Sequence, residues 1–263
     1  MSSHDAAGEF VWHELLTTDP GSAIDFYTGL LGWGTTRQDV RTEDGGSEPY
    51  DMFTNGETPL AGVMRLPDEA QDGGTGPAWL PYVGTADVDG TAGRAGEMGA
   101  DPRVAPTDIP EVGRFAVLAD PWGGLFALYT PLGPGEPRRV PAPGEFSWHE
   151  LATTDARAAL AFYSELLGWE ALDEHDMGEM GPYRIFGTGG VPLGGMFDLP
   201  QGSPHWLSYV QVRDADRSAG DVEERGGDVL NGPMEVPGGD RIAQCRDPQG
   251  AMFAVHAKAP ATV

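Results

Sequence analysis

The tripeptide Trp-His-Glu occurs twice in the sequence, ending at Glu14 and at Glu150. A glutamate carboxylate can accept hydrogen bonds, bind a cationic group or act as a general base, and an indole can stack on a planar ring. Both tripeptides lie in segments whose residues alternate as in a β-strand, so the Trp and the Glu share one face of the strand. We therefore expect the two carboxylates to be functional, and we interpret His13 and His149, on the opposite face, as core histidines.

The two tripeptides belong to a long internal repeat. The segments that begin at Gly8 and Gly144 lie 136 residues apart and are identical at 17 of 26 positions. Between the copies the chain is rich in proline and glycine, which do not sustain a helix or a central strand. We predict a first module at residues 1–131, a linker at 132–143 and a second module at 144–263. The spacing between matching motifs shrinks along the chain, which indicates longer loops in the first copy near residues 34–48 and 68–77.

The composition excludes several classes of partner. The 263 residues include 16 Lys and Arg against 41 Asp and Glu, giving a net charge of -25, which would repel nucleic-acid phosphates and anionic lipid surfaces. No apolar run approaches the length of a membrane span, and the first residues do not resemble a secretion signal. We expect a cytoplasmic monomer or homodimer without a nucleic-acid or membrane partner. The single cysteine, Cys245, lies in a strand-like segment, and we expect a buried thiol.

Each copy opens with a strand and a helix. Asp19 or Asp155 is the expected N-cap of that helix, which carries apolar residues at three- and four-residue spacing and ends at Gly32 or Gly168. Three strands follow, and the same order of elements then recurs within the copy. Further elements are expected at residues 49–53, 60–66, 78–83, 87–99, 114–119 and 125–130 of the first copy, and at 205–210, 214–226, 241–246 and 251–257 of the second.

Four motifs occur in the same order in both copies. They are Thr-Thr-Asp after the first strand, Phe-Tyr-x-x-Leu-Leu-Gly-Trp in the first helix, Asp-x-Asp before the second helix, and an Asp-Pro-x-Gly turn at Asp120 and Asp247. With these motifs the chain, from Glu9 to about Lys258, resembles the vicinal oxygen chelate superfamily, which includes glyoxalase I, extradiol dioxygenases and the fosfomycin- and bleomycin-resistance proteins.

The resemblance implies an α+β fold, a tandem repeat of paired βαβββ units. Each pair would form a curled mixed sheet of eight strands that cups a cleft, with the helices outside. In such proteins a cleft is often completed by half-modules of different copies, and the sequence leaves that pairing open.

Enzymes of this superfamily usually hold a divalent metal through His or Glu side chains on three strands. The matching positions here carry no ligand: they are Trp12, Leu80 and Ala127 in the first copy and Trp148, Leu207 and Ala254 in the second. Indole and alkyl groups offer no lone pair to a metal ion. The resemblance therefore predicts that no metal cofactor occupies the usual position.

Residues two positions away on the same strands should also face the cleft, because side chains alternate across a strand. This reasoning predicts an aromatic pocket that bears a carboxylate and suits a planar ligand. The predicted pocket residues are Glu14, Glu150, Tyr82, Tyr209, Tyr129 and His256, with His205 at the strand entrance and Trp12 or Trp148 available for stacking.

Four functions are compatible with this pattern. The first is a metal-free protein, similar to bleomycin-resistance proteins, that binds a planar or aromatic small molecule. The second is an oxygenase or lyase with a displaced metal such as Fe or Zn, held by Glu14 or Glu150 with His205 and His256. The third is an isomerase, cyclase or lyase that uses one of the glutamates as a general base without a metal. The fourth is a scaffold that has lost its site.

Overall fold

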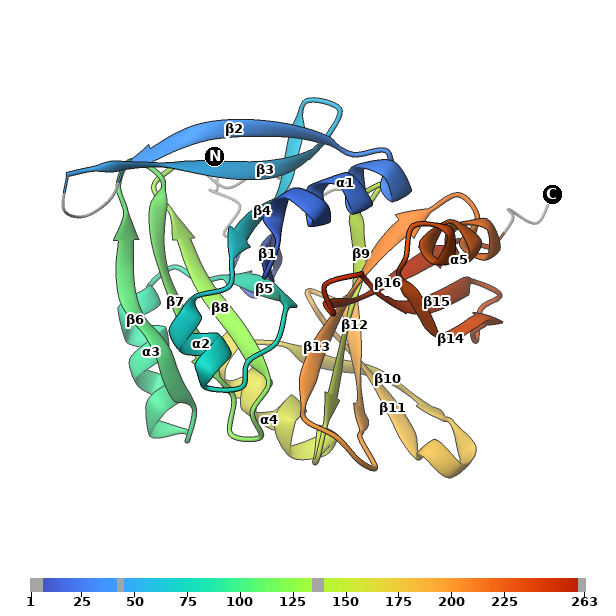
Figure 1. Cartoon of the computed structure of the whole chain (residues 1–263). Coiled ribbons are helices and arrows are strands. Elements are labelled where there is room, and N and C mark those ends of the chain that lie inside the picture. Colours follow the sequence, from blue (N-terminus) through green and yellow to red (C-terminus); the bar gives the residue numbers. More distant parts are fainter. Residues whose placement is uncertain (1–6, 42–44, 134–139, 260–263) are drawn as a thin grey trace.

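The structure is a computed structural model that describes residues 7–41, 45–133 and 140–259. It contains two eight-stranded sheets, one from each copy of the repeat, with the helices packed against them (Figure 1). This arrangement confirms the predicted α+β fold with two copies of a strand-helix-strand-strand-strand pair. No helix in these ranges is long and apolar enough to cross a membrane.

The first module contains the following helices and strands, given in chain order. They are β1 (Phe10–Thr17), α1 (Pro20–Leu31), β2 (Gly34–Arg41), β3 (Ser47–Asn55), β4 (Thr58–Arg65), α2 (Asp68–Asp72), β5 (Ala78–Gly84), α3 (Val88–Glu97), β6 (Asp101–Ile109), β7 (Gly113–Ala119) and β8 (Leu125–Pro131).

The second module repeats this order, except that it has no counterpart of α2 and carries a 3₁₀ turn between its second and third strands. Its elements are β9 (Phe146–Thr153), α4 (Ala156–Leu167), β10 (Glu170–Asp176), η1 (Gly178–Met180), β11 (Pro182–Thr188), β12 (Val191–Asp198), β13 (His205–Val212), α5 (Ala215–Glu224), β14 (Asp228–Glu235), β15 (Arg241–Arg246) and β16 (Met252–Ala257).

The two sheets have the same strand order. The first runs β2-β3-β4-β1-β5-β8-β7-β6 and the second β10-β11-β12-β9-β13-β16-β15-β14. In the first sheet the central strands β1 and β5 are antiparallel, and each has a parallel neighbour on its other side, β4 and β8. Each sheet therefore joins the two half-modules of one copy, which settles the pairing that the sequence left open.

The first helix of each module begins and ends where the sequence predicts. In α1 the side chain of Asp19 accepts a hydrogen bond from the backbone of Ser22, Pro20 occupies the first turn, and Gly32 adopts the left-handed conformation at φ 70°. In α4 Asp155 accepts from Ala158 in the same way. Local sequence thus defines the ends of both helices.

The two expected loops of the first copy are partly regular structure. Residues 34–41 form β2, which pairs along its whole length with β3 and is held by the exposed Arg37–Asp51 ion pair at 2.7 Å. The segment at 68–77 contains the short helix α2. The extra residues therefore lengthen a hairpin and add a helical turn, while residues 42–44 lie outside the described part of the chain, as do residues 134–139 of the predicted linker.

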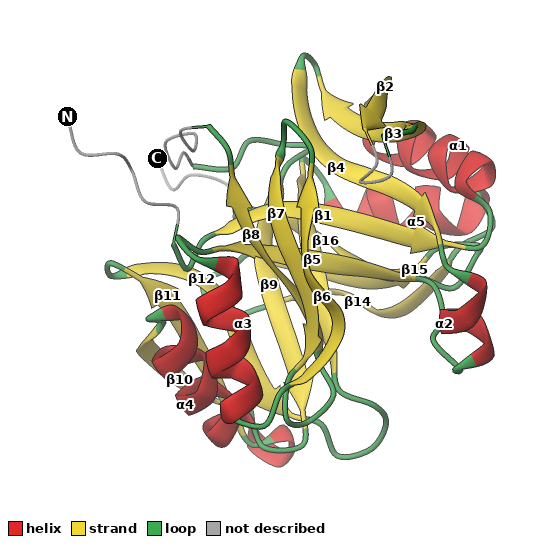
Figure 2. Ribbon diagram, turned by 90° about the vertical axis from the view of Figure 1, so that its left-hand side faces the viewer, coloured by secondary structure: helices red, strands yellow, loops and turns green. Residues whose placement is uncertain are grey.

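Two large hydrophobic cores are shared between the modules. One core combines the first half of the first module with the second half of the second, for example Phe26 with Phe253. The other combines the remaining halves, for example Phe126 with Tyr163. Accordingly α1 lies beside α5, and α3 beside α4 (Figure 2). Cys245 is fully buried in the first of these cores, as predicted, and burial raises the pKa of its thiol to about 12.

His13 and His149 meet where the two modules join. Their Nε2 atoms lie 2.8 Å apart, and each ring stacks on a phenylalanine of the other module at 3.6 Å, Phe146 on His13 and Phe10 on His149. Burial lowers the pKa of both imidazoles, so both are neutral at pH 7, and one donates the hydrogen bond that the other accepts. The prediction that these are core histidines is confirmed.

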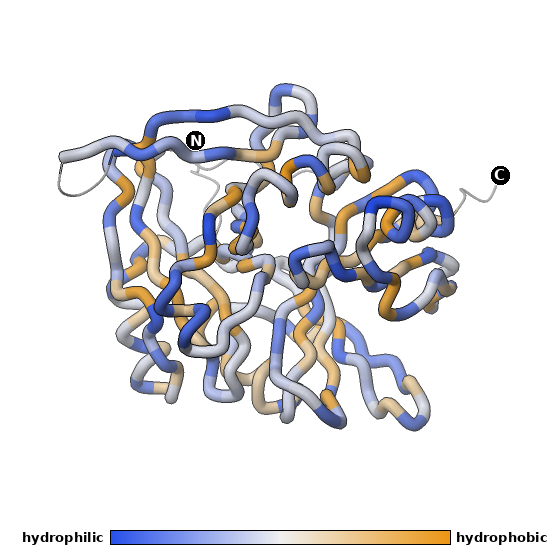
Figure 3. Tube along the Cα trace, viewed as in Figure 1, coloured by the Kyte–Doolittle hydropathy of each residue, from blue (hydrophilic) through white to orange (hydrophobic). Residues whose placement is uncertain are grey.

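The helices α2 and α5 are largely hydrophilic, whereas hydrophobic residues are frequent in the strands (Figure 3). The faces of the sheets that point away from the shared cores do not contribute to those cores.

Candidate functional site

Each sheet has a second, smaller apolar face outside the shared cores, which we call its open face. The first open face is formed by Leu80, Tyr82 and Ala127, packed against the partly exposed Val11, Trp12, Phe115, Val117, Leu125 and Tyr129. The second is formed by Leu207, Tyr209 and Ala254, packed against the partly exposed Trp148, Ile242 and Met252. The predicted alternation is therefore correct, because Trp12, Tyr82, Tyr129, Trp148 and Tyr209 lie on these faces.

Glu14 lies at the centre of the first sheet. In β1 it stands beside Gly62 of β4 and Leu80 of β5, and only 3% of its surface is exposed. The Tyr50 hydroxyl donates to Glu14 Oε2 at 2.6 Å, and the indole of Trp12 donates to the Tyr50 oxygen at 3.2 Å. An indole N–H can only donate, so the chain of hydrogen bonds runs from Trp12 through Tyr50 to Glu14.

The other carboxyl oxygen of Glu14 has no partner. Oε1 is buried and forms no hydrogen bond. Burial raises the pKa of Glu14 to about 8, against the opposing effect of its bonds with Tyr50 and Trp12. A buried polar atom that lacks a hydrogen-bond partner lowers the stability of the folded state by about 1–3 kcal/mol. Oε1 of Glu14 is therefore an unsatisfied acceptor within the sheet.

Glu150 occupies the corresponding place in the second sheet but is fully bonded. Tyr183 donates to its Oε2 at 3.0 Å, and Tyr209 and Gln244 donate to its Oε1, both at 3.1 Å. Trp148 donates to the Tyr183 oxygen at 2.9 Å, which repeats the order seen in the first sheet. Burial raises the pKa of Glu150 to about 7, a smaller rise because three donors favour the charged form.

A glycine on the neighbouring strand makes room for each tyrosine. A Cβ at Gly62 would collide with the Tyr50 hydroxyl and with Glu14 Oε1, and a Cβ at Gly195 would collide with the ring of Tyr183. These glycines are needed for the space they leave, since neither has a positive φ.

The positions at which the resemblance predicts metal ligands lie on the open face of each sheet. In the first sheet they are Trp12, Leu80 and Ala127, which belong to one apolar cluster. Their side chains are indole, isobutyl and methyl groups, and in the described part of the chain no three His, Cys, Asp or Glu side chains form a group that could hold an ion. The donor set does not fit a divalent metal.

The structure does not assemble the displaced metal site. His256 is engaged at both ring nitrogens, with Ser147 at 3.0 Å and Asp240 at 2.7 Å. His205 contacts the carbonyl of Ser203 at 2.9 Å and lies at the start of β13, in a hollow of about 210 Å³ that it shares with Trp79 of the first module. These contacts hold both histidines in interactions separate from the carboxylate of Glu150.

Sequence reasoning missed the residues that bond the two glutamates. Tyr50 and Tyr183 come from β3 and β11, two strands away from the glutamates, and Gln244 comes from β15. A signal for the tyrosines was present, since Pro-Tyr recurs at corresponding places in the two copies. Nothing in the first copy pointed to Gln244, because Val117 stands at its counterpart.

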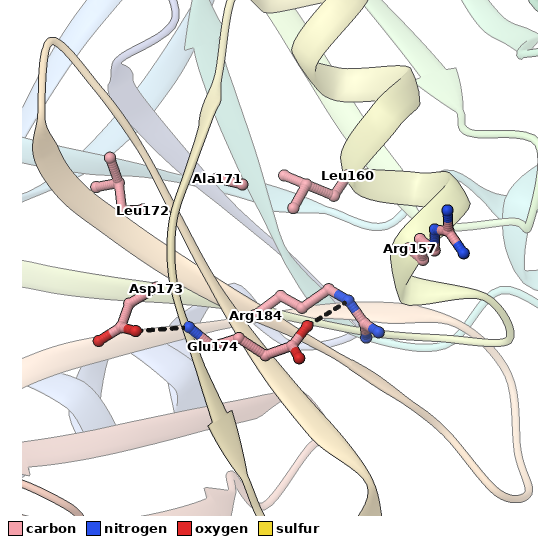
Figure 4. A pocket seen from close by; sticks show the side chains of 7 residues that line it. All are labelled: Arg157, Leu160, Ala171, Leu172, Asp173, Glu174 and Arg184. Atoms are coloured by element: carbon pink, nitrogen blue, oxygen red, sulfur yellow. Dashed lines mark hydrogen bonds and ion pairs between the residues drawn. The ribbon is translucent and has the colours of Figure 1, made fainter.

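Another surface hollow lies apart from these residues. It has a volume of about 370 Å³, between α4 and the strands β10 and β11, with Leu160 and Leu172 among its lining residues (Figure 4). Glu174 pairs there with Arg184 at 3.2 Å. None of the predicted site residues lines this hollow, so we place the candidate site on the open faces.

Comparison with known proteins identifies a family. The sequence model described as "Glyoxalase/Bleomycin resistance protein/Dioxygenase superfamily" matches residues 9–128 and 145–255. The putative glyoxylase CFP32 of Mycobacterium tuberculosis is 34% identical over 255 residues, covering 95% of this chain and 94% of that protein. The anthracycline biosynthesis protein DnrV of Streptomyces peucetius is 34% identical over 266 residues, covering 95% and 93%.

Solved structures share the fold at low identity. The Mn(II)-bound glyoxalase from Novosphingobium aromaticivorans superimposes with a TM-score of 0.65 at 15% identity, covering 97% of this chain and 83% of that one. The 2,3-dioxygenase LapB from a Pseudomonas species gives a TM-score of 0.60 at 15% identity, covering 95% and 91%. Both support the two-module architecture.

Proposed function

The chain belongs to the glyoxalase/bleomycin resistance protein/dioxygenase superfamily, and from that premise we propose that it is a metal-free binding protein for a planar aromatic small molecule. The ligand lies on an open face, where Trp12 or Trp148 stacks on its ring and the neighbouring glutamate bonds its polar group. The observation that carries this proposal is the buried, unpartnered Oε1 of Glu14 within a wall of aromatic side chains.

Three further observations support a ligand of this type. Large flat side chains with a few polar groups are typical of pockets for planar ligands. The net charge of -25 favours a neutral or cationic ligand over an anionic one. The name of one relative concerns anthracyclines, which are fused-ring aromatic compounds. The proposal is metal-free because indole, alkyl and methyl groups occupy the metal-ligand positions of the superfamily.

The test is titration with a panel of planar aromatic compounds of one to four fused rings, followed by tryptophan fluorescence and by calorimetry. We expect saturable binding of at least one member. Trp12→Ala should weaken that binding at least tenfold if the ligand stacks on the first face, and Trp148→Ala if it stacks on the second. Trp122→Phe is the matched control, because Trp122 packs on Phe162 away from both open faces. Failure of every compound to bind would refute the proposal.

One observation favours a second function, proton transfer without a metal. Burial raises the pKa of Glu14 to about 8 and that of Glu150 to about 7, and a carboxyl group with a pKa near neutrality can exchange a proton with a bound substrate. In this reaction the carboxylate removes a proton from the carbon beside a ketone and returns it from the carboxyl group.

A planar ketone such as 2-tetralone separates the two functions. In D₂O, a proton-transfer enzyme would accelerate replacement of the hydrogen beside the carbonyl, as seen by NMR. Glu14→Gln or Glu150→Gln should then slow the exchange at least a hundredfold while binding persists. If the ketone binds but its exchange is not accelerated, the proton-transfer function is refuted and only the binding function remains.

A further inference from the structure

The two open faces differ around the buried glutamate, and this difference assigns them different roles. We infer that the chain has one working ligand site, on the first open face, and that the ligand there donates a hydrogen bond to Glu14 from a hydroxyl group on its aromatic ring. The inference rests on the proposed function, since it specifies which face binds and what the ligand must offer.

On the second open face, the protein itself completes the bonding of the glutamate. Glu150 accepts from Tyr183 at one oxygen and from Tyr209 and Gln244 at the other. The amide of Gln244 also donates to the Tyr209 oxygen at 3.1 Å, which closes the network. A carboxylate whose two oxygens are both hydrogen-bonded gains little from a further donor on a ligand. The second open face therefore repeats the structure of the site without binding a ligand.

On the first open face, no side chain takes the place of Gln244. Val117 pairs with Ala127 of β8 as Gln244 pairs with Ala254 of β16, so the two residues occupy matching positions. A valine side chain cannot donate a hydrogen bond, and Oε1 of Glu14 is left without a partner. A ligand that places a donor over Val117 would supply the bond that Gln244 supplies in the other module.

The first open face also presents more aromatic surface. Phe115 and Tyr129 flank Tyr82, with ring centroids 6.3 and 6.4 Å from it. Their counterparts in the second module are Ile242 and His256, and His256 is held by Asp240. The face with the unsatisfied carboxyl is therefore also the better platform for a planar ring.

The chemistry of the missing bond indicates the ligand class. Gln244 offers an N–H donor, so its substitute must donate to the carboxylate, as a phenolic hydroxyl does. Such a bond favours the charged carboxylate. Because burial raises the pKa of unliganded Glu14 to about 8, binding below that pH must release a proton. Affinity for the phenol should accordingly rise with pH up to about 8, and it should fall only at higher pH, where the phenol itself loses its proton.

Calorimetric titration with 2-naphthol and with its methyl ether, 2-methoxynaphthalene, tests the number of sites and the need for a donor. We expect one 2-naphthol per chain, proton release below about pH 8, and at least tenfold weaker binding of the ether. Two sites per chain, equal binding of the ether, or affinity that falls as the pH rises toward 8 would overturn the inference. If 2-naphthol, 2-methoxynaphthalene and every compound of the panel all fail to bind, the proposed function is refuted instead.

Exchanging the matching residues gives a second, independent test. Val117→Gln should give Glu14 a partner from the protein, which weakens 2-naphthol binding at least tenfold and raises the thermal unfolding midpoint. A variant that merely misfolds would lose both binding and stability. Gln244→Val combined with Tyr209→Phe removes both donors from Glu150 Oε1 and should raise the stoichiometry from one to two. Unchanged binding in Val117→Gln would contradict the inference whatever the effect of these changes in the second module.

Discussion

The buried carboxyl of Glu14 should make the stability of the protein depend on pH. Its pKa is about 8 in the folded chain against 4.5 for an exposed glutamate, so the folded state keeps a proton that the unfolded state has lost. The contribution of this group to the free energy of unfolding is therefore complete below about pH 4.5 and is lost as the pH rises through 8. The slope is at most about 1.4 kcal/mol per pH unit.

Urea unfolding of wild type and Glu14→Gln at several pH values between about 5 and 9 measures this effect. The glutamine carries no titratable proton, so the stability of the variant should increase relative to wild type across this range. Glu150→Gln is the matched comparison and should show a smaller gain, because the pKa of Glu150 is raised only to about 7. Parallel pH profiles for wild type and Glu14→Gln would show that this carboxyl is not desolvated.

Strand alternation alone was enough to place Trp12, Glu14 and Tyr82 on one face. It could not reveal Tyr50, because that side chain reaches Glu14 across β4 from a strand whose register is set by a hairpin. The glycine that leaves room for this reach, Gly62, looks in the sequence like any other glycine in a strand. Contacts between strands that are not neighbours in the sheet depend on curvature and register, which local sequence patterns do not encode.

Two of the four motifs join elements of different modules, namely the Phe-Tyr helix motif and the Asp-Pro-x-Gly turn. Tyr27 of α1 donates to Asp247 at 3.1 Å and accepts from the indole of Trp79 at 2.9 Å. Asp247 belongs to the Asp-Pro-x-Gly turn of the other module, and its second oxygen accepts from the backbone of Ala251 at 2.9 Å. Tyr163 and Asp120 repeat the contact at 2.9 Å. Helix and turn are thus locked together across the interface.

Tyr27→Phe should therefore destabilise the chain. Loss of the hydroxyl leaves the Trp79 N–H and one Asp247 oxygen buried without a partner, which costs about 1–3 kcal/mol. Urea unfolding measures the change, and Tyr163→Phe should give a similar loss. The control is Tyr129→Phe, whose hydroxyl bonds the Val112 carbonyl at an exposed position and whose removal should cost less than about 0.5 kcal/mol. Equal effects at all three tyrosines would argue against a special role for the interface pair.

Helix ends were predictable from the sequence, whereas the outer strands were not. Asp19 and Gly32 delimit α1 through local hydrogen bonds and backbone conformation that any sequence reader can anticipate. The strand β2 is mostly polar and exposed, with only its pairing to β3 to define it. Such an edge strand lacks the apolar alternation that marks a strand in the sequence, so its residues are typical of a loop.

At the scale of the whole molecule, the repeat forms two sheets but does not form two independent domains. Each large core takes residues from both copies: Leu128 of β8 and Leu151 of β9 belong to one core, and Leu15 of β1 and Val255 of β16 belong to the other. The Trp33 indole donates to Gly144 at 2.7 Å, and that of Trp169 to Gly8 at 2.6 Å. A single copy alone would expose the helix-covered face that the other copy buries.

The whole chain should consequently unfold in one step. Because neither core survives when either copy unfolds, a heat-capacity scan should show one transition whose calorimetric enthalpy equals the van't Hoff enthalpy. A chain that ends before Phe146 should be unfolded or should pair with a second copy of itself, since exposed apolar surface of this extent is buried by association. Mixing it with a chain that begins at residue 140 should restore the native circular dichroism. Two separate transitions in the full chain, or a stable monomer of the first module, would mean that the shared cores contribute little to cooperativity.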